Sequence, residues 1–104
     1  MVDIIRTPFT IVQSNGPVVE LTLRREAGSP PDTFHLDATE SDKTGTGDGS
    51  FINDTFFLCV IHWRHGPIGE YHGTRGNNGR ITGFAFDQTN HASQASWFTL
   101  QEFH

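Results

Sequence analysis

The chain has 104 residues and a formal net charge of −5, from 12 acidic and 7 basic residues. Lys43 is the only lysine, so this composition argues against binding to nucleic-acid phosphates or to an anionic membrane surface. The length suits one domain, predicted over residues 1–104, and no apolar run approaches the ~20 residues that span a bilayer.

Short aromatic and β-branched runs separated by turn signals predict strands throughout, because no segment sustains a helical period. The segment Ser41–Gly49 is rich in Gly, Thr and Asp, and it is either a mobile loop or a glycine-softened strand end. The strands predicted in the first half of the chain are Phe9–Gln13, Val18–Arg25, Phe34–Thr39 and the short Ser50–Ile52.

The stretch Thr55–Asp87 predicts three further strands in a meander. Its first turn falls at Gly66-Pro67 and its second at Asn77-Asn78 or Asn78-Gly79, because Gly, Pro and Asn are the residues that turns favour. A polar loop then leads to an eighth strand over Ala95–Glu102.

Eight short strands without a crossover helix predict an all-β, antiparallel, up-and-down β-barrel. Closing the sheet removes both exposed edges, which an open sheet of this size would have to protect. A β-sandwich is the alternative fold.

The turn positions predict which side chains of the meander share a face. Loops of two or four residues at the first turn pair Trp63 with Glu70 and Ile61 with His72. A loop of three or five residues would exchange these partners. The predicted first face comprises Phe57, Cys59, Ile61, Trp63, Glu70, His72, Ile81, Gly83 and Ala85.

The first face combines an aromatic side chain with the small residues Gly83 and Ala85, which leave room for a ligand. We therefore expect Trp63, Glu70 and His72 to line the barrel interior. The opposite face carries Phe84 and Phe86 and is predicted to pack against another copy in a homo-oligomer, a dimer or larger.

The preferred function is non-enzymatic binding of a small, partly apolar ligand. In this hypothesis Trp63 and Trp97 form the apolar wall, while Glu70 and His72 orient a polar group. The alternative is a barrel enzyme of the isomerase or cyclase type, with Glu70 and His72 as its acid–base pair. The histidines lack the spacing of a zinc site, so we expect no metal and no cofactor.

Carbohydrate binding is a third hypothesis, because sugars stack on exposed aromatic rings flanked by polar side chains. Near the last predicted turn, Trp97 is close in sequence to Asn90, His91 and Gln94. This arrangement would make the protein a lectin that recognises sugars through its surface loops.

The single cysteine, Cys59, lies in an apolar run and is expected to be a buried, inert thiol. The first residues lack a basic region followed by an apolar core, so no secretory signal is predicted. The expected location is the cytoplasm.

The eight strands, with tryptophans in the fifth and the last, resemble the small barrels of the avidin and lipocalin superfamilies. The run Gly69-Glu70-Tyr71-His72-Gly73-Thr74 is similar to the Gly-x-Tyr/Phe-x-Gly strands of avidin-like proteins. The Gly-x-Trp element that opens avidins and lipocalins is missing between Phe9 and Arg25, so biotin binding is not implied. The resemblance implies a barrel with a ligand at its mouth.

Overall fold

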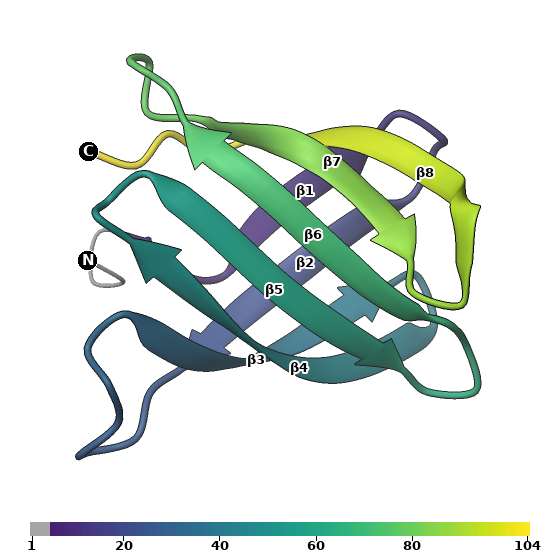
Figure 1. Ribbon diagram of the computed structural model, residues 1–104, viewed down its shortest axis with the longest axis horizontal. Helices are drawn as coiled ribbons and strands as arrows, with labels where there is room; N and C mark the ends of the chain where they lie inside the picture. Colours follow the sequence, from purple (N-terminus) through teal and green to yellow (C-terminus); the bar gives the residue numbers. More distant parts are fainter. Residues whose placement is uncertain (1–4) are drawn as a thin grey trace.

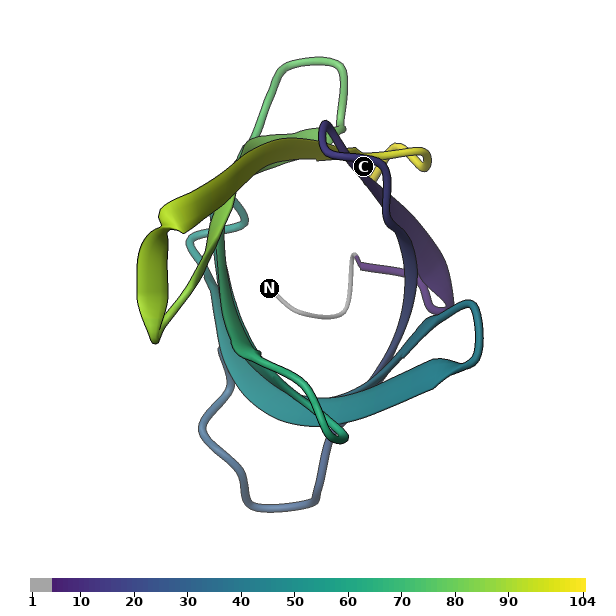
Figure 2. The same cartoon turned by 90° about the vertical axis from the view of Figure 1, so that its right-hand side faces the viewer.

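The protein is a closed antiparallel barrel in which each strand pairs with the next and β8 returns to β1. The computed structural model describes residues 5–104, apart from the side chain of residue 91. Figure 1 shows the barrel from the side, and Figure 2 shows the ring of strands at right angles to that view. The strands are β1 (Phe9–Gln13), β2 (Val18–Arg24), β3 (Thr33–Glu40), β4 (Lys43–Ile52), β5 (Phe56–Trp63), β6 (Ile68–Arg75), β7 (Ile81–Asp87) and β8 (Asn90–Thr99).

The predicted all-β up-and-down barrel of eight strands is confirmed. Most strand bounds agree within one or two residues, and the largest differences are in β4 and β8. The glycine-rich segment is strand from Lys43 onward and continues into the predicted Ser50–Ile52 strand, while β8 begins five residues before Ala95. Residues 5–104 include no helix long and apolar enough to cross a membrane.

Glycines let β4 approach β5 unusually closely. A Cβ built on Gly47 would lie 1.8 Å from the carbonyl oxygen of Val60, a distance that no side chain tolerates. Three inward positions of β4 are glycine. Two of them, Gly47 and Gly49, pair with Leu36 and Phe34 of β3 respectively. The composition that suggested a loop instead marks a strand pressed against its neighbours.

Side chains alternate between the interior and the exterior along the strands, except where the register of β7 and β8 shifts between Phe86 and Asp87. The interior is dominated by aromatic and β-branched groups that fill the barrel around Phe57. The core comprises Ile5, Phe9, Ile11, Val19, Leu21, Phe34, Leu36, Ala38, Phe51, Phe57, Cys59, Ile61, Tyr71, Ile81, Ala85, Trp97 and Phe103.

One end of the barrel is plugged by the segment that follows β8. The Phe103 ring packs edge-on against the Phe9 ring, with centroids 5.4 Å apart. The backbone N–H of Phe103 donates to the carbonyl of Gly79 over 2.7 Å. Arg75 donates to the Phe103 carbonyl over 3.1 Å. Phe9, near the start of the described chain, and Phe103, near its end, therefore close this end of the barrel.

Truncating the plug should destabilise the barrel. Phe103→Ala removes a buried ring and should lower the free energy of unfolding by about 3 kcal/mol, as other buried Phe→Ala changes do. Leu100→Ala, at a half-exposed position nearby, should change it by less than about 0.5 kcal/mol. Urea unfolding followed by circular dichroism makes the comparison, and equal midpoints for the two variants would contradict the role assigned to Phe103.

Candidate functional site

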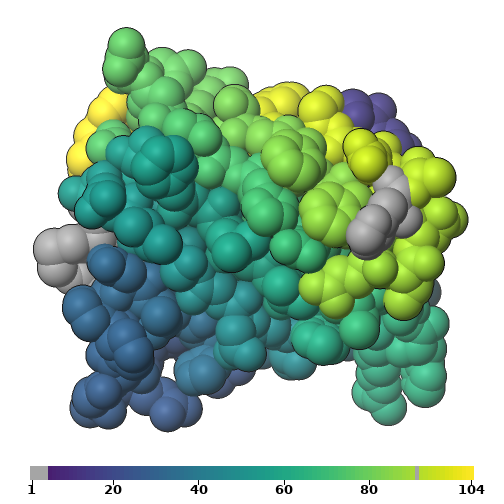
Figure 3. Space-filling view, in the orientation of Figure 1, coloured from purple at the N-terminus to yellow at the C-terminus, as the bar shows by residue number. Residues whose placement is uncertain are grey.

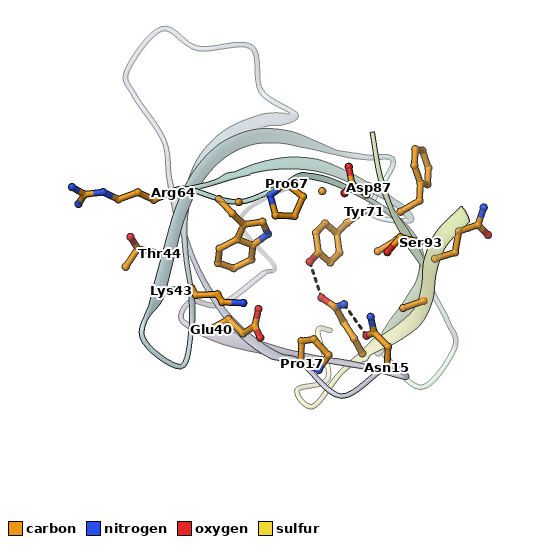
Figure 4. A pocket seen from close by; sticks show the side chains of 18 of the residues that line it. Asn15, Pro17, Glu40, Lys43, Thr44, Arg64, Pro67, Tyr71, Asp87 and Ser93 are labelled. Carbon is orange, nitrogen blue, oxygen red and sulfur yellow. Dashed lines mark hydrogen bonds between the residues drawn. The ribbon is translucent and has the colours of Figure 1, made fainter. Parts of the chain in front are cut away.

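The end of the barrel opposite the plug opens into a cavity of about 790 Å³ (Figure 4). It lies where β1, β3, β5 and β7 end and β2, β4, β6 and β8 begin. The lining residues are Gln13, Asn15, Pro17, Glu40, Asp42, Lys43, Thr44, Trp63, Arg64, His65, Gly66, Pro67, Gly69, Tyr71, Ala85, Phe86, Asp87, Ser93, Gln94 and Ala95.

A short hydrogen-bond chain runs along the cavity from Tyr71 toward the rim. The Tyr71 hydroxyl donates to Gln13 Oε1 over 2.7 Å, and Gln13 Nε2 donates to Asn15 Oδ1 over 3.2 Å. Figure 4 draws both bonds as dashed lines. The chain fixes the orientation of the Gln13 amide and joins β6 to β1 across the barrel.

Tyr71 is a neutral hydrogen-bonding group at neutral pH. Burial raises the pKa of its hydroxyl well above the usual range, and Cys59 and Glu40 add to the rise, while Trp63 opposes it. Because the single phenolic proton is donated to Gln13, the Tyr71 hydroxyl cannot donate a second hydrogen bond.

Gly69 keeps space between the two aromatic side chains of the cavity wall. A Cβ at this position would lie 3.2 Å from Tyr71 Cε1 and 3.7 Å from Trp63 Nε1. Trp63 is half-buried and packs against the core, so the prediction that it faces the interior is confirmed. Ala85 and Ala95 are opposite each other on β7 and β8 and leave further room.

Glu70 and His72 lie outside the barrel, so their predicted interior position is wrong. The register pairs Glu70 with Val60 and His72 with Leu58, and Trp63 has no partner on β6. The two side chains are within hydrogen-bond distance, His72 Nε2 to Glu70 Oε1 at 2.9 Å, and Gln88 donates to the same carboxylate over 3.1 Å. Neither residue lines the cavity.

A three-residue loop explains the reversal. The Trp63 N–H donates to the carbonyl of Pro67, and the Gly66 N–H donates back to the Trp63 carbonyl, which leaves residues 64–66 as the loop. His65 occupies the left-handed region at φ 58°, so the bend is centred on His65 instead of Gly66-Pro67. An odd loop moves every β6 side chain to the other face.

A second odd loop restores β7 to its predicted face. Hydrogen bonds between Gly76 and Arg80 and from Gly79 to Gly76 leave residues 77–79 as the loop, with Gly79 at φ 85°. Ile81, Gly83 and Ala85 therefore face inward, as predicted, but opposite Arg75, Gly73 and Tyr71. Because the two errors cancel, only β6 was assigned to the wrong face.

Trp97 is a core residue rather than an aromatic platform at a loop. Its side chain is only 3% exposed, its Nε1 donates to the Phe84 carbonyl over 2.8 Å, and its ring contacts Phe57 and Tyr71. Trp97 does not line the cavity, so its predicted part in the apolar wall is not supported by its position. The lectin hypothesis requires an exposed aromatic face on which a sugar can stack, and Trp97 has no such face.

The polar cavity residues that the sequence did not reveal include Gln13, Glu40, Lys43 and Tyr71. A signal for two of them was present. The alternation of Phe9 and Ile11 continues to Gln13, and the alternation of Phe34, Leu36 and Ala38 continues to Glu40. Lys43 and Tyr71 could not be found this way, because one lay in the presumed loop and the other in the reversed strand.

The described residues were also compared with the requirements of a metal site and of a reactive thiol. No group of three or more His, Cys, Asp or Glu side chains suited to a metal ion occurs among the described residues. Cys59 is fully buried, as predicted, and burial raises the pKa of its thiol far above the usual range.

No protein-family model matches the chain, and a search of curated proteins finds no significant match.

Thiol reactivity tests the facing of β6. In the folded protein, diluted until it is monomeric, His72→Cys should react rapidly with a polar disulfide reagent, because position 72 lies on the exterior. Native Cys59 should react only after unfolding and serves as the internal control. Protection of the cysteine at position 72 in the folded monomer would contradict the register described.

Proposed function

We propose that the protein is a β-barrel that binds a small, partly apolar molecule in the cavity at its open mouth. The cavity carries this proposal: its volume falls within the roughly 300–1,000 Å³ typical of small-molecule pockets. Its wall combines aromatic and methyl groups with polar side chains, of which Tyr71 and Gln13 are oriented by hydrogen bonds, and such polar groups fix the orientation of ligands in pockets. The similarity to avidin-like and lipocalin barrels noted in the sequence supports the same location for a ligand.

Binding is favoured over the acid–base enzyme and the lectin by where the relevant side chains lie. Trp63 faces the cavity, whereas Glu70 and His72 are on the exterior and Trp97 is in the core. The site residues of this proposal are therefore Trp63 and Tyr71 on the wall, with Gln13, Glu40 and Lys43 as its polar groups.

The cavity can be tested by blocking it. The neutral dye N-phenyl-1-naphthylamine should bind the native protein and quench Trp63 fluorescence by energy transfer. Ala85→Phe places a ring in the cavity and should weaken dye affinity at least about tenfold. Phe84→Ser, at the exterior position next along the same strand, is the matched control and should leave this quenching unchanged. Loss of quenching in the control but not in Ala85→Phe would refute the cavity as the site.

We also propose that the exterior of β5–β8 pairs with a second copy of the chain. Phe56, Leu58, Phe84 and Phe98 are each more than a third exposed on this face, which Figure 3 views directly. Leu58, His72 and Phe84 form one row across three strands, and the His72 and Phe84 rings stack with centroids 5.1 Å apart. An apolar surface of this kind on an otherwise acidic protein is typical of a protein–protein interface.

Sedimentation velocity tests the association. We expect the native protein to sediment as a homo-oligomer, and the double variant Leu58→Asp/Phe84→Asp to sediment as a monomer because buried unpaired carboxylates oppose association. Thr22→Asp, on the exterior of β2, adds a charge away from the face and should leave the oligomer intact. A native monomer at micromolar concentration would contradict the proposal.

A further inference from the structure

Two side chains of opposite charge enter the cavity from one hairpin. Glu40 ends β3 and Lys43 begins β4, and the two residues are directly opposite each other in the register. Both follow the inward alternation of their strands, after Ala38 in β3 and before Gly45 in β4. Figure 4 shows both side chains directed into the cavity.

Neither charged group is held by a neighbouring side chain. The Lys43 ammonium and the Glu40 carboxylate have no hydrogen-bond or ion-pair partner among the side chains of the described residues. The contrast is the exterior pair Arg24 and Asp37, which meet at 2.8 Å. This hairpin therefore presents a cation and an anion, directly opposite each other, to an incoming molecule.

This pairing selects among ligands by charge. A simple anion drawn to Lys43 meets repulsion from Glu40 across the hairpin, and a simple cation drawn to Glu40 meets repulsion from Lys43. A molecule that carries an ammonium group and a carboxylate group on the same carbon atom satisfies the two groups together. The remaining wall near Trp63, Ala85 and Ala95 is apolar and suits a hydrocarbon or aromatic body.

We propose that the cavity binds a small zwitterion with an apolar body, of the free amino-acid type. Its ammonium group faces Glu40, its carboxylate faces Lys43, and its side chain lies against Trp63 and Ala85. The inference rests on the proposed function, because it assigns a ligand class to the same cavity.

Four probes with one phenyl body and different head groups separate these possibilities: L-phenylalanine, 2-phenylethylamine, 3-phenylpropionate and 3-phenylpropanamide. Isothermal titration calorimetry should show L-phenylalanine binding at least about tenfold tighter than the cation, the anion or the neutral amide. Equal affinity for all four, preference for a singly charged or neutral probe, or binding of none would overturn the zwitterion.

Charge-removing variants should change the preference in opposite directions. Glu40→Gln should favour 3-phenylpropionate over L-phenylalanine, and Lys43→Gln should favour 2-phenylethylamine. Arg24→Gln and Glu20→Gln remove the same charges elsewhere and should keep the native preference, since both residues are on the exterior of β2 and neither lines the cavity. Unchanged preference in both cavity variants would overturn the assignment.

The neutral-dye titration distinguishes failure of this inference from failure of the proposed function. If the dye binds and Ala85→Phe blocks it while L-phenylalanine shows no advantage, the cavity remains a ligand site for another class of molecule. If neither the dye nor any phenyl probe binds, both proposals fail.

Discussion

The strict alternation of side chains in a closed sheet determines what this barrel encloses. Each strand sends every second residue inward, so the parity of each connecting loop decides which set of side chains is inside. The pairing of β1 with β8, at Ile11↔Thr99 and its neighbours, removes any free edge at which the register could adjust. Adding or removing one residue in a hairpin loop therefore moves the inward side chains of the next strand to the exterior and its exterior side chains to the interior.

The two ends of the barrel are built differently. At one end, Phe103 and Phe9 pack together and the chain after β8 is hydrogen-bonded to Arg75 and Gly79. At the other end, small residues such as Gly69, Ala85 and Ala95 take inward positions, and the space they leave is the cavity. The same strands thus provide both a packed core for stability and an open mouth for binding. Tyr71 links the two, since its ring contacts Trp97 in the core and its hydroxyl contacts Gln13 in the mouth.

The sequence alone was sufficient for the fold and for most of the inward residues, because strand alternation and turn residues are local signals. It predicted the inward faces of β5 and β7 but reversed β6, since both hairpins use three-residue loops with His65 or Gly79 in the left-handed region. A histidine in that conformation carries no strong sequence signal, and the Gly66-Pro67 pair suggested a bend one residue later. The cavity charges were missed because glycines in β4 were taken for a loop or strand end.

The open mouth, and not the Glu70–His72 face, is the proposed binding site for a small molecule. Heteronuclear NMR of the two tryptophan indole groups tests it most directly, because Trp63 lines the cavity and Trp97 is buried beneath it with its Nε1 bonded to Phe84. Titration with 2-naphthol should shift the Trp63 Nε1 resonance and the amides of Gln13 and Tyr71, with smaller changes at Trp97. Shifts confined to residues on the exterior of β5–β8, with the Trp63 resonance unmoved, would contradict the account.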